Sequence, residues 1–217
     1  MVRRANACWA GHATGLLAFP PSCYVAAMNV QRPVAVEPFR VRLNVEQFQL
    51  LDRSGSFRDH AKTELLDGTI YAMNAQFRAH ARAKGQLFRA FDKALAAAGS
   101  TLEVLSEVSV AMPPHGMPEP DLVVTSEAAG DGPVPVASIV VIVEVSDTTL
   151  DHDLGVKAAI YAAGEVSEYW VVDLKGRVLH QMWSPGADGY GERREVALGE
   201  RVKAVTFDGL AVDTSDV

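Results

Sequence analysis

Two carboxylates stand near the ends of apolar segments, where their side chains can do chemistry. Asp121 begins the apolar run 121–125, and Glu144 lies near the end of the run 138–145. A carboxylate in such a run is costly to bury unless it is paired, protonated or bound to a metal. Two carboxylates on neighbouring strands also repel each other, and a divalent cation relieves that repulsion. Because oxygen ligands favour Mg²⁺ or Mn²⁺, Asp121 and Glu144 are candidate metal ligands.

Lys157 follows these carboxylates on a predicted helix. An ammonium group there can orient or activate a water molecule and offset the charge that builds on a phosphate. The alternative is an ordinary surface pair with Asp153, four residues earlier, which contributes only a few tenths of a kcal/mol. Glu64, on a predicted strand, is either a further member of the site or an exposed strand residue.

Several common catalytic motifs are absent from the chain. It has no G-x-x-x-x-G-K-[ST] phosphate loop, no G-x-S-x-G nucleophile turn and no strand-linked G-x-G-x-x-G, and its six histidines show no H-x-x-x-H spacing. Nucleoside triphosphatases, serine hydrolases and zinc proteases of these types are therefore excluded.

Turn and capping signals define the elements that must position the N-terminal part of this site. Asp67-Gly68 separates two strand-like segments, 62–66 and 69–73, and an Asp-Gly pair favours the positive φ angles of a tight hairpin. This hairpin places Glu64 on a strand. Before it, Asn44 and Gln47 have the spacing of a capping box that opens a short helix.

Residues 78–98 predict the longest helix, which Gly99 ends. Its apolar side chains gather on one side, together with that of the preceding Phe77, and its basic residues on another; the apolar set is Phe77, Phe88, Phe91 and Leu95. The basic stripe consists of Arg78, Arg82, Arg89 and Lys93. We expect either a solvated helix face or a surface that contacts nucleic-acid phosphates.

The remaining apolar segments predict a mixed sheet. The segments 101–112, 121–125 and 138–145 are predicted strands, and 139–143 is apolar without alternation, which is typical of a central strand covered on both faces. A helix that Asp151 or Asp153 opens runs to Ala163, and a second hairpin surrounds 174–176. The fold class is therefore α/β in the mixed α+β sense.

Charge and cysteines are distributed unevenly along the 217 residues. The net charge is −7, whereas residues 1–36 carry +3 and residues 37–217 carry −10. We interpret residues 1–36 as a mobile extension and 37–217 as one domain. The apolar run in the extension is too short to span a bilayer, so no membrane association is expected. With both cysteines in the extension, the domain needs no disulfide, which is compatible with a cytoplasmic location.

A series of short motifs occurs in a characteristic order. It consists of Glu64-Leu65-Leu66-Asp67-Gly68, His80, Glu107-Val108-Ser109-Val110, Pro120-Asp121-Leu122, Val143-Glu144-Val145-Ser146, Asp153-Leu154-Gly155-Val156-Lys157 and Glu168-Tyr169-Trp170-Val171-Val172-Asp173. This series resembles the Uma-two family of bacterial endonucleases, within the PD-(D/E)XK, or restriction-endonuclease-like, superfamily. The resemblance covers about residues 40–185 and rests on the order and spacing of several motifs.

The resemblance implies a restriction-endonuclease-like mixed central sheet flanked by helices, and metal-dependent hydrolysis of a phosphodiester. Asp121 and Glu144 would hold the metal, Glu64 would assist, and Lys157 would be the catalytic lysine. The superfamily's E-x-K motif has Lys two residues after Glu, where this chain has Ser146. The family shares this displacement.

Accessory roles are open for His80, Glu107 and Asp153. His80 is equally well explained as a satisfied core histidine.

The leading hypothesis is thus a Mg²⁺- or Mn²⁺-dependent endonuclease that acts on DNA. The acidic body argues against strong metal-independent binding to nucleic acid. Two other hypotheses are a non-cleaving nucleic-acid- or protein-binding module on this fold and a metal-dependent phosphohydrolase of small phosphodiesters. The sequence leaves a homodimer open.

Overall fold

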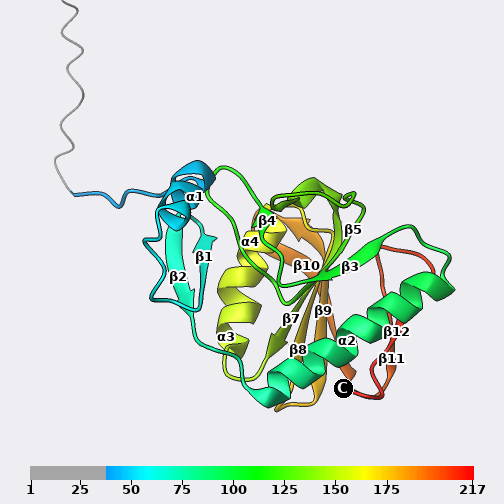
Figure 1. The fold of residues 1–217 in the computed structure, drawn as a ribbon. Coiled ribbons are helices and arrows are strands. Elements are labelled where there is room, and N and C mark those ends of the chain that lie inside the picture. The colour runs from blue at the N-terminus through cyan, green and yellow to red at the C-terminus, as the bar shows by residue number, and fades with distance from the viewer. Residues whose placement is uncertain (1–37) are drawn as a thin grey trace, which may run out of the picture. The chain divides into compact units, whose positions relative to one another are not determined.

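The computed structural model describes residues 38–217, so the predicted N-terminal extension and both cysteines lie outside the described residues. The helices and strands of these described residues belong to one compact unit, Arg40–Val217 (Figure 1). No helix in the described part of the chain is both long enough and apolar enough to cross a membrane.

The centre of this unit is a six-stranded mixed sheet with the strand order β10-β9-β8-β7-β5-β3. Its strands are β3 (Glu103–Ser106), β5 (Leu122–Thr125), β7 (Ile139–Ser146), β8 (Glu168–Asp173), β9 (Val178–Gly186) and β10 (Gly189–Ala197). Only β7 and β8 pair in parallel within this sheet. The chain reaches β8 from β7 through a helix, the usual connection between parallel strands.

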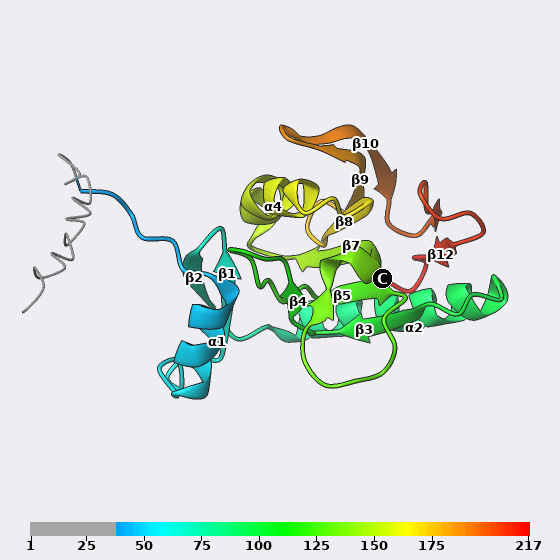
Figure 2. The ribbon, with the colours of Figure 1, turned by 90° about the horizontal axis from the view of Figure 1, so that it is seen from above.

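Helices cover both faces of the sheet (Figures 1 and 2). One face packs against α2 (Arg78–Ala97), where Phe91 lies 5.2 Å from Trp170 between ring centroids. The other face packs against α4 (Ala158–Ala163), where Tyr161 contacts Tyr169. This arrangement explains the unalternating apolar sequence of β7 and confirms it as a central strand.

A separate hairpin carries Glu64. It consists of β1 (Lys62–Leu66) and β2 (Thr69–Met73), and its turn has positive φ at Asp67 and Gly68, as predicted. Helix α1 (Val45–Arg53) begins with the predicted capping box and packs on Leu65. Leu65 and Met117 exchange backbone hydrogen bonds of 3.2 and 2.7 Å, which attach the hairpin to the loop before β5.

Short elements complete the fold. They are β4 (Val110–Ala111), β6 (Val134–Pro135), the 3₁₀ turn Val136–Ser138, α3 (Leu150–His152), the π-helical segment Asp153–Lys157, β11 (Arg201–Lys203) and β12 (Ala211–Asp213). The buried carboxylate of Glu168 accepts hydrogen bonds from the indole of Trp170 and from the backbone amides of Val205 and Thr206. The segment after β11 is therefore attached to the central sheet.

Three local predictions were wrong. The single strand predicted over 101–112 is divided into β3 and β4, and Glu107, which lies between them, has a φ of 53°, outside the β region. The helix after β7 begins at Leu150 with Thr149 as its N-cap, not at Asp151 or Asp153. Phe77, expected on the apolar face of the long helix, precedes α2 and is 76% exposed.

The turn of the hairpin that carries Glu64 requires a glycine at position 68. A Cβ atom there would lie 2.9 Å from the backbone Cα of Arg42, and Gly68 has a φ of +75°. We expect Gly68→Ala to lower the free energy of unfolding by about 1–3 kcal/mol, as strain and collision combine. Urea unfolding measures this change.

Gly85→Ala is the matched control, since Gly85 lies inside α2 with no tighter neighbour than an Arg89 nitrogen 3.6 Å away. It should stabilise the protein by about 0.5–1 kcal/mol. Equal stability of Gly68→Ala and the unmodified protein would contradict the role of the turn.

Candidate active site

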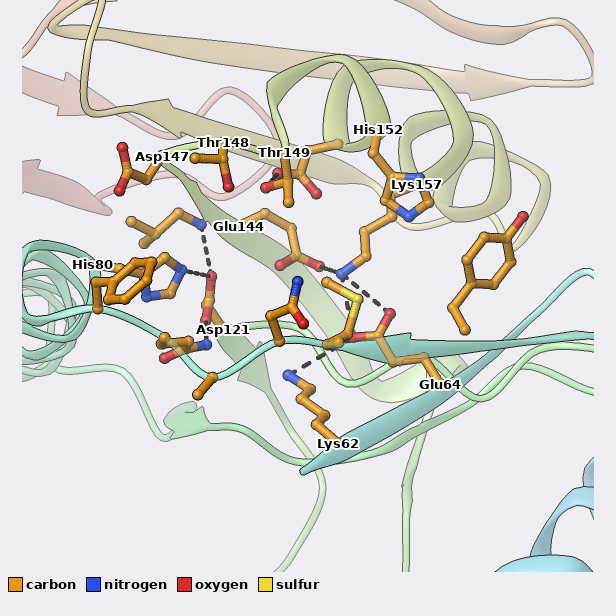
Figure 3. A pocket seen from close by; sticks show the side chains of 18 of the residues that line it. Lys62, Glu64, His80, Asp121, Glu144, Asp147, Thr148, Thr149, His152 and Lys157 are labelled. Carbon is orange, nitrogen blue, oxygen red and sulfur yellow. Dashed lines mark hydrogen bonds and ion pairs between the residues drawn. The ribbon is translucent and has the colours of Figure 1, made fainter. Parts of the chain in front are cut away.

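A cavity of about 370 Å³ lies where the hairpin, the start of α2 and the ends of β5 and β7 meet. It brings together six of the predicted residues, shown in part in Figure 3: Glu64, His80, Asp121, Glu144, Asp153 and Lys157. Glu64, Asp121, Glu144 and Lys157 are almost completely buried. Residues that are far apart in the sequence thus form one site.

Lys157 lies between two carboxylates. Its Nζ is 2.8 Å from Glu144 Oε1 and 3.3 Å from Glu64 Oε1, and the Tyr161 hydroxyl donates to Glu144 Oε1 at 2.8 Å. The sequence-based alternative of a simple surface pair between Lys157 and Asp153 is therefore wrong, because Lys157 is buried and paired with Glu64 and Glu144.

Burial and charge pull the pKa values of this group in opposite directions. Burial raises the pKa of Glu144 and of Glu64, and the nearby Lys157 ammonium only partly offsets this effect. Burial alone would lower the pKa of Lys157, but the two carboxylates outweigh it and raise that pKa. Lys157 is therefore a cation at neutral pH, and the carboxylates hold protons more strongly than they would in water.

Lys157 ends a π-helical segment. The Ala158 amide donates to the carbonyl of Asp153, five residues earlier, and Tyr169 Oη also donates to that carbonyl at 3.0 Å. Within the same segment, the Asp153 carboxylate accepts a hydrogen bond of 2.6 Å from Thr149. Burial raises the pKa of Asp153, against the effect of that hydrogen bond. Single π turns within helices occur frequently at functional sites.

Asp121 is held at the other end of the cavity (Figure 3). Its Oδ2 accepts from the Val145 amide at 2.8 Å and lies 3.1 Å from His80 Nε2. Burial alone would raise the pKa of Asp121, but the hydrogen bond and charge of His80 outweigh it and lower the pKa. Burial likewise opposes, without cancelling, the rise that Asp121 causes in the pKa of His80. His80 is therefore a partner of Asp121 and not a simple core histidine.

A chain of polar contacts connects Asp121 to Glu107. Gln76 donates to Asp121 Oδ1 at 3.1 Å, while Lys84 donates to Gln76 at 2.7 Å and to Glu107 at 2.6 Å. Glu107 is not among the residues that line the cavity. The Glu107 amide also donates to the Asp121 carbonyl at 3.2 Å, so Glu107 is linked to the site without lining the cavity.

Sequence reasoning missed several cavity residues: Lys62, Tyr71, Gln76, Phe77, Asp147, Thr149 and His152. Lys62 donates to the Glu119 carbonyl and lies 3.7 Å from Glu64 Oε1. Its place beside Glu64 on the same strand gave no pattern to detect, whereas Thr149 was detectable as a helix-capping residue type.

The basic stripe lies outside the cavity. Arg78, Arg82, Arg89 and Lys93 are all exposed on α2. Arg89 and Lys93 also line a second hollow between α2 and the β11–β12 region, together with Arg201. The stripe is therefore available for contact with a partner.

The cavity offers a divalent cation two carboxylate ligands, Asp121 and Glu144. Within residues 38–217, no three His, Cys, Asp or Glu side chains are grouped closely enough to hold a metal ion. Asp121, directly before β5, and Glu144, on the neighbouring strand β7, nevertheless line one cavity, and carboxylates outnumber lysines along its wall. One or two carboxylates completed by water and substrate phosphate are the usual environment of Mg²⁺, so the residues present fit such an ion.

Comparison with solved structures identifies the class of fold. The chain is similar to the protein described as "a putative nuclease belonging to DUF820 from Anabaena variabilis ATCC 29413", with a TM-score of 0.58 and 12% sequence identity. The match covers 80% of this chain and 96% of that one. The mixed sheet flanked by helices is thus a fold that this nuclease-like protein shares.

The family model Uma2, described as "Putative restriction endonuclease", matches residues 45–215. The chain belongs to this family. The matched range extends well beyond residue 185, the approximate end of the resemblance seen in the sequence, and includes β11 and β12. The comparison with curated proteins found no match.

The buried position of Lys157 leads to a prediction about stability. Lys157→Met should lower the free energy of unfolding at pH 7 in EDTA by about 3–5 kcal/mol, because it leaves two buried carboxylates without their cation. The loss should be smaller at pH 5. A raised carboxyl pKa stabilises the fold in acid, and that stabilisation is lost as the pH rises through the folded-state pKa.

Denaturant unfolding at both pH values measures this effect. Lys175→Met is the control, since Lys175 is 68% exposed in its pair with Asp147 and should contribute less than about 1 kcal/mol. A loss for Lys157→Met that stays constant between pH 5 and 7 would contradict the assignment.

Proposed function

We propose that the protein is a divalent-metal-dependent endonuclease that hydrolyses phosphodiester bonds in DNA. The observation that carries the proposal is the convergence of three residues in one cavity: Asp121 directly before β5, Glu144 on β7, and Lys157 on the helical segment that follows β7. Membership in the Uma2 family supports it. A metal ion held by carboxylates, with an ammonium group nearby, can stabilise the negative charge that develops on a phosphate during hydrolysis.

Asp121 and Glu144 would hold the metal. Both hydrogen bonds that Glu144 accepts go to Oε1, so Oε2 is the more available oxygen. A bound Mg²⁺ or Mn²⁺ would supply Lewis-acid stabilisation of negative charge on the phosphate oxygens. His80 favours this use of Asp121, since its hydrogen bond keeps the carboxylate ionised and fixes its orientation.

The Lys157 ammonium would act on the water molecule and on the phosphate. Glu64 and Glu144 fix its position from two sides, and its raised pKa keeps it protonated. It can therefore donate hydrogen bonds that orient the attacking water and offset charge in the transition state, but it does not itself accept the proton. The role of Glu64 is to position Lys157.

The distribution of charge indicates where DNA would bind. The described domain is acidic, so nucleic acid would approach along the exposed basic stripe on α2, whose first turn also carries His80. Contacts to phosphates from this stripe would position the strand without reading its sequence.

The first test of this function is cleavage. The purified protein should cut DNA with Mg²⁺ or Mn²⁺ and not in EDTA, and both Asp121→Asn and Glu144→Gln should lower kcat by at least about 100-fold. Asp151→Asn is the control, because Asp151 is exposed on the same helix that leads to Lys157 and is not among the residues that line the cavity. Gel analysis of a labelled plasmid or oligonucleotide measures the rates.

The same samples distinguish the other hypotheses. Full cleavage by both variants would reject the site. Hydrolysis of a small phosphodiester without cleavage of DNA would favour the phosphohydrolase. Binding without any hydrolysis, and without Asp121-dependent heat on titration with Mn²⁺, would favour the non-cleaving module.

The basic stripe gives an independent prediction. Arg82→Ala combined with Arg89→Ala should weaken DNA binding and reduce the slope of log K against log salt by about 2, because each arginine would neutralise about one phosphate. Arg53→Ala, an exposed arginine on α1, is the control. An unchanged slope in the double variant would leave the stripe as a solvated helix face.

A further inference from the structure

Phe77 is a large apolar side chain left exposed at the edge of a polar cavity. It is 76% exposed, and it lines the same cavity as the buried carboxylates Asp121 and Glu144. An isolated exposed apolar residue needs no explanation on an ordinary surface. Beside a site proposed to act on a phosphate, an aromatic ring offers a flat apolar face to the nucleoside attached to that phosphate.

The backbone that carries this ring is held in place. Phe77 is the N-cap residue of α2, and its carbonyl accepts a hydrogen bond of 3.1 Å from Ala81. The preceding residue, Gln76, is hydrogen-bonded through its side chain to both Asp121 and Lys84. The backbone of Phe77 is therefore held in place close to Asp121, the proposed metal ligand.

The burial of the acidic residues limits how a substrate can reach them. Asp121 and Glu144 are only 3% and 4% exposed, so a scissile phosphate has to enter the cavity. The nucleosides on either side of that phosphate are then brought to the cavity edge. At about 370 Å³, the cavity has the size of a site for a small ligand.

Only an unstacked nucleobase can stack on the Phe77 ring. Both faces of a base within a duplex are covered by neighbouring bases, so it has no free face for an aromatic side chain. An unstacked base has one, and stacking on an aromatic residue is favourable for every base type.

We propose that Phe77 stacks on an unstacked nucleobase next to the scissile phosphate, and that the preferred substrate is nucleic acid with such a base. This inference rests on the proposed nuclease function and specifies its substrate. The unstacked base has two sources, a single strand or a nucleotide extruded from a duplex.

Kinetics with Mn²⁺ test the inference on a single strand, a mismatched duplex and a matched duplex, each with 2-aminopurine at the predicted position. Phe77→Ala and Phe77→Leu should raise KM for the single strand about 5- to 150-fold, the range expected when one base no longer stacks on an aromatic ring. Phe77→Trp should stay within about two-fold of the unmodified protein, because it keeps an aromatic face. Leu50→Ala, which removes an exposed apolar side chain on α1, should have no effect.

Each outcome decides the question. Cleavage confined to the single strand identifies that source, and cleavage of the duplexes with a rise in 2-aminopurine fluorescence identifies extrusion. An active enzyme whose KM is unchanged in Phe77→Ala and Phe77→Leu overturns the inference alone, as does a Phe77→Leu variant that behaves like Phe77→Trp. A protein that cuts none of the substrates overturns the proposed function, and the inference with it.

Discussion

The ion pairs of Lys157 are the interaction on which the site depends. A buried ammonium is stable only with compensating charge, and Glu64 and Glu144 supply it from a hairpin strand and a central strand. The two ion pairs join three parts of the chain: the hairpin strand β1, the central strand β7 and the helical segment after β7. The hairpin, the sheet and the helix after β7 are therefore positioned by the same charges that the proposed chemistry uses.

The carboxyl pKa values are shifted in opposite directions at the two ends of the cavity. At the Lys157 end, burial dominates and raises the pKa of both carboxylates, so they resist ionisation. At the Asp121 end, His80 and a backbone amide overcome burial and favour the anion. The surroundings of these carboxylates thus shift their pKa values in opposite directions within one cavity.

Much of this arrangement was predictable because it depends on short-range signals. The Asp67-Gly68 turn, the capping box before α1 and the unalternating β7 each have a local physical cause, and each agrees with the structure. The contacts across the cavity have no such signal. The link from Gln76 to Asp121 spans 45 residues and depends on the angle at which α2 meets the sheet, which a linear pattern does not encode. The exposure of Phe77 was missed because helical periodicity does not apply to the residue before a helix.

The buried carboxylate of Glu168 has a consequence for the extent of the folding unit. It takes part in no proposed chemistry, yet it accepts hydrogen bonds from the amides of Val205 and Thr206, beyond the last strand of the sheet. Without those two amides, the buried Oε2 atom of Glu168 would keep only the Thr206 hydroxyl as a hydrogen-bond donor. The C-terminal segment therefore forms part of the interior of the domain, although it lies at the end of the sequence. A domain boundary placed directly after the last recognisable motif would cut through one compact unit.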